Sequence, residues 1–248
     1  MELISNFMPF FRENFPSWQT IGVGVPFSLA WTWFCLLVAG HLKLGGMPTG
    51  YTRKVFHFLI FTSVVVLQWL WGTPVVLVFG SMCSLVVFYA VFRGPGNLLY
   101  EALAREKDEP RRSWFVILPW LTTLIGGMVS NVLFGPLAIA GYLVTGMGDA
   151  IGEPVGTRFG RHPYRVWSLS SVRAERTVEG SGAVFAVSLL ALVLTVLLIP
   201  ALKESSLWFP RVVGIALIAA VVEAITPHGW DNATMQLVPT ALVYGWMT

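Results

Sequence analysis

The chain has 248 residues, of which 55% are hydrophobic and only 12% are charged, and it contains 11 Trp and 17 Phe. A soluble domain carries about twice that fraction of charged residues. The composition therefore excludes an ordinary soluble protein and indicates an integral membrane protein whose partner is the lipid bilayer, with no nucleic acid expected.

An apolar stretch of about 20 residues crosses a bilayer as a helix. The sequence predicts an all-α, polytopic bundle of about seven to eight such helices, forming one domain over residues 1–248. The candidate spans, in chain order, are 20–41, 55–71, 73–92, 114–134, 136–157, 180–200, 208–226 and 233–247. The sequence leaves open whether two of these spans, 55–71 and 233–247, cross the membrane fully. The first is followed by Gly72-Thr73-Pro74, and the second is short.

The cations are distributed unevenly among the connections. Segments 42–54, 93–113 and 158–179 hold 13 of the 16 Lys and Arg residues. With eight spans these three segments share one side of the membrane, and the positive-inside rule makes that side cytoplasmic. Both termini are then expected outside. The charged patch 105–112, REKDEPRR, is expected to be a solvated loop near anionic headgroups.

Two carboxylates, Asp149 and Glu153, stand at the end of the fifth span. Carboxylates in a membrane segment are costly and are functional candidates by default. At a spacing of four residues they share one helix face, where a divalent cation would relieve their repulsion and would also hold substrate phosphates. The alternative is that both are simply solvated at the interface.

Glycines recur every four residues from Gly148 through Gly152 and Gly156 to Gly160. This spacing indicates close helix contact in a membrane, and it also leaves bare backbone that a phosphate can approach. Arg158 and Arg161 stand beside it as candidate phosphate ligands, because guanidinium groups bind phosphate oxygens well.

The stretch RAERTVEGSGAVF, residues 173–185, returns to polar residues before the sixth span. Arg173 and Arg176 are suited to phosphate oxygens. Glu179-Gly180-Ser181-Gly182 opens a helix, whose free N–H groups favour anions. A purely structural explanation also accounts for these residues. They would cap the N-terminus of a helix, and the arginines would lie on the cytoplasmic side as the positive-inside rule predicts.

These motifs together resemble a family of CTP-using membrane enzymes. The pattern Asp-x-x-small-x-x-x-Gly-x-x-x-Gly, then cation-Thr-x-Glu-Gly after a basic linker, resembles the polyprenol kinases (dolichol, phytol and farnesol kinases) and CTP-dependent diacylglycerol kinase. A related signature marks CDP-diacylglycerol synthase. RKVFH at 53–57 and VEAITPHGWDN at 222–232 extend the resemblance, whose specific part is 148–182. The chain departs from the pattern at Gly152, where alanine is commoner, and at Glu175-Arg176, where the family has two lysines.

The resemblance implies a CTP-dependent lipid-alcohol kinase that uses Mg²⁺, with its CTP- and metal-binding core in 148–182. The implied catalytic residues are Asp149, Glu179 and His57, with Glu179 or His57 accepting the hydroxyl proton. The implied metal ligands are Asp149, Glu153 and Asp231. The implied nucleotide ligands are Arg53, Lys54, Gly152, Gly156, Arg158, Gly160, Arg161, Arg176, Thr177, Gly180 and Asn232.

Some of these residues also have purely structural explanations. An interfacial histidine such as His57 is often a hydrogen-bonded structural group, and Asp231 and Asn232 fit the start of a helix as well as a binding site. The kinase is expected to act on an isoprenoid alcohol such as phytol, farnesol or a polyprenol. Three other functions stay open: a cytidylyltransferase acting on a lipid phosphate, a CTP-dependent diacylglycerol kinase, and a transporter, against which the clustering of charge at one face counts. The residues do not identify the acceptor or the oligomeric state.

Overall fold

The computed structural model describes residues 2–167, 174–227 and 229–248. Within them the chain is helical apart from two short antiparallel strands, as the predicted bundle requires. The elements are α1 (Glu2–Asn14), α2 (Trp18–Leu44), α3 (Thr49–Trp71), α4 (Thr73–Arg93), α5 (Leu98–Glu101), η1 (Glu106–Asp108), α6 (Trp114–Phe134), η2 (Gly135–Leu137), α7 (Ala138–Leu143), η3 (Val144–Asp149), α8 (Ala150–Phe159), β1 (Pro163–Val166), β2 (Ala174–Thr177), α9 (Val178–Leu198), η4 (Pro200–Lys203), α10 (Trp208–Ile225) and α11 (Asp231–Met247).

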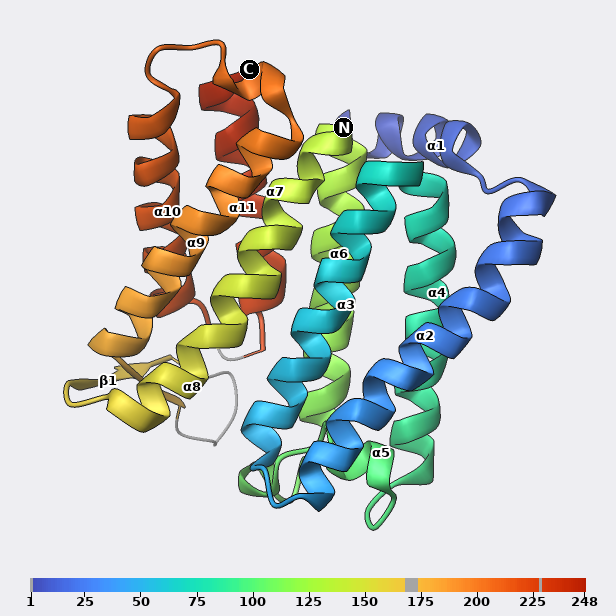
Figure 1. Cartoon of the computed structure of the whole chain (residues 1–248), viewed down its shortest axis with the longest axis vertical. Helices are drawn as coiled ribbons and strands as arrows, with labels where there is room; N and C mark the ends of the chain where they lie inside the picture. The colour runs from blue at the N-terminus through green and yellow to red at the C-terminus, as the bar shows by residue number, and fades with distance from the viewer. Residues whose placement is uncertain (1, 168–173, 228) are drawn as a thin grey trace.

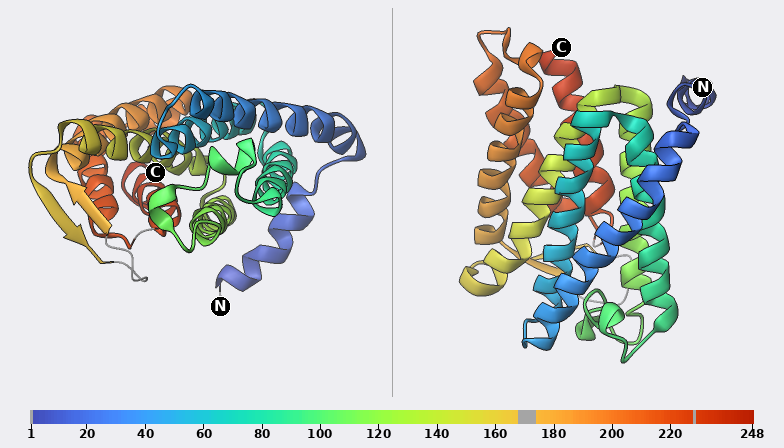
Figure 2. Two further views of the ribbon diagram at one scale, coloured as in Figure 1. Left: turned by 90° about the horizontal axis from the view of Figure 1, so that it is seen from below. Right: turned by 45° about the vertical axis from the view of Figure 1, so that its right-hand side comes forward.

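The long helices run side by side as a bundle, and the connections rich in Lys and Arg gather at one of its ends (Figure 1). The α2–α3 turn, α5 with its flanking loops, and the two strands all lie there, and we call it the basic end. The C-terminal end of α11 lies at the opposite end. Helix α1 also lies there and crosses the bundle instead of running along it (Figure 2).

In the part of the chain that the structure describes, six helical segments are long and apolar enough to cross a membrane, so the predicted count of seven or eight is not confirmed. One segment, Trp114–Phe159, contains two of the predicted spans. The chain reverses direction between them, where Gly135 has φ +55° (Figure 1). Helix α11 has only 17 residues, about 25 Å of helix against a hydrocarbon core of about 30 Å.

Glycines let α3 and α11 approach the helix α7–η3–α8 very closely. A Cβ at Gly146 would lie 2.4 Å from Cβ of Phe61 on α3, and one at Gly141 would lie 2.2 Å from the carbonyl oxygen of Gln236 on α11. Small residues at helix contacts serve this purpose in membrane proteins. The contact at Gly146 brings the basic start of α3 beside the acidic start of α8.

The glycine series of α8 faces α9. A Cβ at Gly152 would lie 2.8 Å from Cγ2 of Val184, and one at Gly156 would lie 2.8 Å from Oγ1 of Thr177. The interpretation of these glycines as a helix contact is therefore confirmed. Thr177 also caps α9, because its hydroxyl accepts a hydrogen bond from the Gly180 N–H at 3.1 Å.

We predict that Gly141→Ala lowers the melting temperature of the purified protein in detergent, because the added methyl group meets main-chain atoms of α11. Overpacking of this kind costs about 1–3 kcal/mol. Gly22→Ala is the matched control, because a Cβ at Gly22 on α2 meets nothing within 4 Å. Equal melting temperatures for the two variants would contradict the close contact of α7 with α11.

Candidate functional site

A polar cavity of about 670 Å³ opens at the basic end of the bundle. Residues far apart in the chain line it, from α3, the loop before α6, α8, the strands and the starts of α9 and α11. Among the described residues, its charged lining consists of five cations and six carboxylates: Arg53, Lys54, Arg105, Lys107, Arg176, Asp108, Asp149, Glu153, Glu175, Glu223 and Asp231. This described lining is thus highly charged yet close to electrically neutral.

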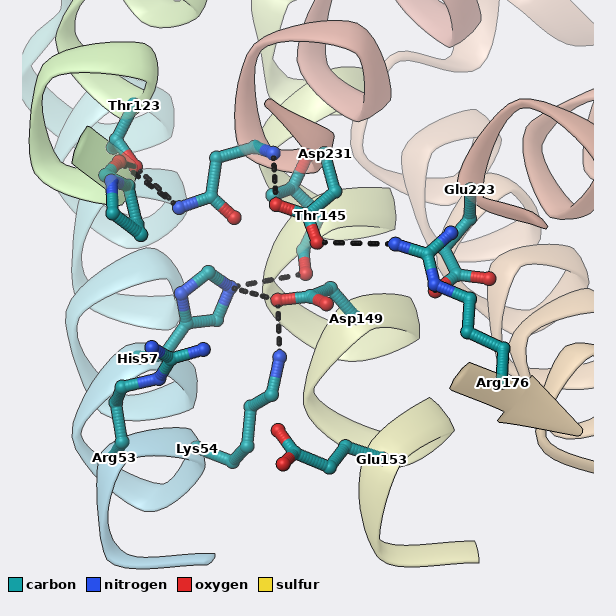
Figure 3. Close-up of polar contacts among 12 residues, drawn as sticks. Arg53, Lys54, His57, Thr123, Thr145, Asp149, Glu153, Arg176, Glu223 and Asp231 are labelled. Atoms are coloured by element: carbon teal, nitrogen blue, oxygen red, sulfur yellow. Dashed lines mark hydrogen bonds and ion pairs between the residues drawn. The ribbon is translucent and has the colours of Figure 1, made fainter. Parts of the chain in front are cut away.

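The ion pair between Lys54 and Asp149 lies at the centre of the site. Nζ of Lys54 is 2.6 Å from Oδ2 of Asp149, and their side chains are only 8% and 9% exposed (Figure 3). Asp149 is therefore buried and paired, so its interpretation as a solvated interfacial residue is wrong. It ends a π-helical stretch, Val144–Asp149, and π-helical turns are frequent at functional sites.

His57 stands one turn beyond Lys54 on α3. Its Nε2 lies 3.2 Å from the carbonyl oxygen of Thr145 and 3.7 Å from Oδ2 of Asp149. A carbonyl oxygen only accepts hydrogen bonds, so Nε2 carries the hydrogen in this contact. In the neutral ring Nδ1 is then the basic nitrogen. The ring also lies against Phe61, with 4.4 Å between their centroids.

Glu153 faces the loop between α4 and α6. Its Oε1 lies 3.2 Å from both Nη1 of Arg105 and Nζ of Lys107. Arg105 and Asp108 are 4% and 1% exposed, so the expectation of a solvated loop is wrong for these two residues. Burial opposes the charge on Arg105, but the carboxylates of Glu153 and Asp108 hold its pKa above the usual value.

Arg176 joins strand β2 to the last two helices. Its Nε lies 3.2 Å from Oε1 of Glu223 on α10, and its Nη2 lies 3.4 Å from Oδ2 of Asp231 on α11 (Figure 3). Glu223 is 7% exposed and was not among the predicted site residues. The signal for it was its place before Asp231 in the stretch VEAITPHGWDN.

An apolar pocket of about 160 Å³ adjoins the polar cavity. Aromatic and aliphatic side chains of α3, α4 and α6 form most of its lining, including Phe56, Ile60, Phe61, Val64, Phe79, Val87, Phe115, Trp120 and Leu124. The two spaces share four lining residues, Arg53, Lys54, Asp149 and Asp231. His57 lines only the apolar pocket, which therefore ends at the charged groups of the site.

The structure brings most of the predicted residues together and separates a few. Gly152, Gly156, Thr177 and Gly180 line the polar cavity with the charged groups. Six do not line it: His57, Arg158, Gly160, Arg161, Glu179 and Asn232. Arg158, Gly160 and Arg161 are exposed at the end of α8.

The contacts of Glu179 and Asn232 explain why they do not face the cavity. Glu179 is bound to His162, with 2.6 Å between Oε1 and Nδ1. The Asn232 amide donates to Oγ1 of Thr123 at 2.7 Å and so joins α11 to α6 beside the apolar pocket. Arg173 lies outside the described residues.

The predicted metal ligands do not form a closed cage. Within the described ranges, no three His, Cys, Asp or Glu side chains converge as a metal site, and Asp149, Glu153 and Asp231 each contact a Lys or Arg. Protein-bound Mg²⁺ commonly uses only one or two carboxylates plus substrate phosphates. The donors therefore fit an ion that arrives with a phosphate ligand.

Comparison of the chain with protein-family models, with curated proteins and with solved structures finds no match.

We predict that Lys54→Met destabilises the protein, because it leaves Asp149 as an uncompensated buried carboxylate. Breaking a buried ion pair costs about 3–5 kcal/mol, measured here as a lower melting temperature in detergent. The double variant Lys54→Met/Asp149→Asn should recover much of that loss. Lys43→Met is the matched control, because its partner Glu106 is 61% exposed and exposed pairs contribute about 0–1 kcal/mol. Equal losses in Lys54→Met and Lys43→Met would contradict a buried pair.

Proposed function

We propose that the chain is a CTP-dependent kinase that phosphorylates a membrane lipid alcohol, such as phytol, farnesol or a polyprenol, and releases CDP. One observation carries the proposal: the polar cavity and the apolar pocket meet at Arg53, Lys54, Asp149 and Asp231. A polar phosphoryl donor and an apolar acceptor need such a pair of adjoining spaces. The resemblance of 148–182 to CTP-using lipid kinases supplies the identity of the donor.

The acceptor would enter from the bilayer between α3, α4 and α6, with its chain in the apolar pocket and its hydroxyl at the shared charged residues. His57 lines that pocket beside Asp149. Its basic Nδ1 makes it the proton acceptor of this proposal in preference to Glu179, which is bound to His162 outside the cavity lining. Phosphoryl transfer needs little from protein beyond such positioning and charge neutralisation.

The phosphates of CTP would lie in the polar cavity, whose carboxylates slightly outnumber its cations. A triphosphate entering alone would meet little net attraction, which supports entry as a magnesium complex. Asp149 and Asp231 would hold the ion, which would neutralise charge on the phosphates. In this proposal Glu153 holds Arg105 and Lys107, which line the cavity with it.

The carboxylate excess also bears on the second candidate, a cytidylyltransferase. That reaction requires an acceptor that is already a phosphate, and Glu175 contributes a negative charge to the lining where the resembling family has a cation. Like charges repel, so the lining favours a neutral alcohol. A CTP-dependent diacylglycerol kinase also phosphorylates a neutral alcohol, so the same argument applies to it. It differs from the proposed kinase only in the identity of that alcohol.

Transfer of the γ-phosphoryl group is the direct test of this proposal. Purified protein in lipid nanodiscs is given γ-labelled or α-labelled CTP with a panel of phytol, farnesol, a polyprenol, diacylglycerol and phosphatidic acid. We expect γ-label in an organic-extractable prenyl monophosphate, with CDP as the coproduct. Transfer of α-label to phosphatidic acid with release of pyrophosphate would instead establish the cytidylyltransferase.

The Asp149→Asn variant is the control for that assay. Asparagine keeps the shape of the side chain and an oxygen that accepts from Lys54, but it removes the charge, so transfer should be abolished. Because the variant leaves Lys54 without its counter-ion, its melting temperature in detergent is measured alongside, and the comparison is made at a temperature at which the variant is folded. Near-normal turnover of Asp149→Asn at limiting Mg²⁺ would reject the proposed role of this carboxylate.

We also propose that the eight predicted helices all cross the membrane, with the basic end in the cytoplasm and both termini outside. The gathering of the basic loops at one end of the bundle supports this orientation (Figure 1). Arg165→Cys on β1 should resist an impermeant thiol reagent in intact cells, whereas Ser206→Cys, between η4 and α10, should react. The reverse pattern would place the cavity away from cytoplasmic CTP.

A further inference from the structure

The loop between α4 and α6 supplies a wall of the polar cavity. We call residues 102–112 the docked loop. Its first three residues, 102–104, are almost completely buried, and Arg105, Lys107 and Asp108 line the cavity. The sequence pattern assigned no site residue to this stretch, so its cations are available for a function of their own.

Hydrogen bonds and ion pairs hold the docked loop along its whole length. Oγ1 of Thr52 on α3 donates to the carbonyl oxygen of Ala102 at 2.8 Å. Lys43 on α2 pairs with Glu106, and the hydrogen bond from Lys43 lowers the pKa of that carboxyl. At the far end Nη2 of Arg112 donates to the carbonyl oxygen of Ala104. The loop is thus bound to α2 through Glu106 and to α3 through Ala102. These contacts hold the backbone on both sides of Arg105, which lines the cavity.

Arg105 and Lys107 occupy different environments although both contact Glu153. Arg105 is 5% exposed in its side chain and also binds Asp108, with 2.8 Å between Nε and Oδ2. Lys107 is 65% exposed, and Glu153 is the one carboxylate with which it forms an ion pair in the described structure. Arg105 is therefore fixed in place. Lys107 can exchange Glu153 for another anion at little cost in free energy, because its side chain is already largely exposed to solvent.

Two other cations of the site are held more firmly by carboxylates, whereas Arg53 donates to the carbonyl oxygen of Phe115 at 3.3 Å. The side chain of Lys54 is 8% exposed and pairs with Asp149, and that of Arg176 is 15% exposed and binds two carboxylates. Moving either group to a ligand would leave a buried carboxylate without its partner, which is strongly unfavourable. Lys107 carries no such penalty, because Arg105 remains on Glu153 after Lys107 leaves.

We propose that the docked loop is a polyphosphate-binding element in which Lys107 contacts the phosphate chain of the ligand. Arg105 acts as a positioning residue that fixes the loop to Glu153 on α8. The identity of the polyphosphate as CTP rests on the proposed function, but binding of a phosphate chain does not.

The test measures binding to the full-length protein in nanodiscs with Mg²⁺, using CTP, inorganic tripolyphosphate and cytidine as separate probes. Lys107→Ala should weaken binding of CTP and of tripolyphosphate by about tenfold or more, the scale of one lost charge-assisted contact. Lys107→Arg should restore most of the affinity. Arg111→Ala is the matched control and should change neither dissociation constant, because Arg111 is exposed on the same loop outside the cavity lining.

Equal dissociation constants for Lys107→Ala and Arg111→Ala would overturn the inference, as would failure of the unmodified protein to bind tripolyphosphate. Binding that depends on Lys107 without any transfer of label to lipid would support the inference and reject the kinase. Transfer of label to lipid, together with CTP and tripolyphosphate affinities that Lys107→Ala leaves unchanged, would support the kinase and overturn the inference.

Discussion

The buried ion pair between Lys54 and Asp149 is the constraint on which the rest of the site depends. Two charges removed from water are stable only if they stay together, so α3 and the start of α8 must remain in contact at this point. Gly146 makes that approach possible, because any larger residue would collide with Phe61. The position of His57 and the junction of the two cavities follow from the same contact.

The remaining charges of the site follow a similar rule. Glu153 faces Arg105 and Lys107, and Arg176 faces Glu223 and Asp231. Four helices (α3, α7–η3–α8, α10 and α11), a strand and a loop therefore take part in ion pairs at one end of a bundle that is otherwise apolar. Because the charges nearly balance, the site stays compact before a ligand binds, and a highly charged ligand must either bring its own counterion or exchange with an existing pair.

The helices were predictable because their signal is local. Each predicted span coincides closely with helical structure, and Asp149, Glu153 and the glycines of α8 were found from spacing alone. The number of crossings was less secure, since Gly135 joins two helices in one apolar segment and α11 is short. The docked loop was missed because its fixed position comes from distant partners, such as Thr52 for Ala102 and Glu153 for Arg105, which no local pattern reveals.

Sequence also could not separate residues that face the cavity from those that do not. Glu179 and Thr177 belong to one motif, yet Thr177 lines the cavity while Glu179 turns to His162. The direction of a side chain at the start of α9 depends on how β1 and β2 pair, with Tyr164 opposite Arg176. That pairing brings together two strands that are separate in the sequence, which no local pattern specifies.

The π-helical stretch Val144–Asp149 also sets a limit on how this chain can change in length. A residue added to or removed from a helix rotates everything beyond it by about 100°. The fit of Asp149 to Lys54 therefore depends on the number of residues in this turn as much as on their identity. A one-residue deletion here would turn the carboxylate toward another neighbour while changing no side chain of the site.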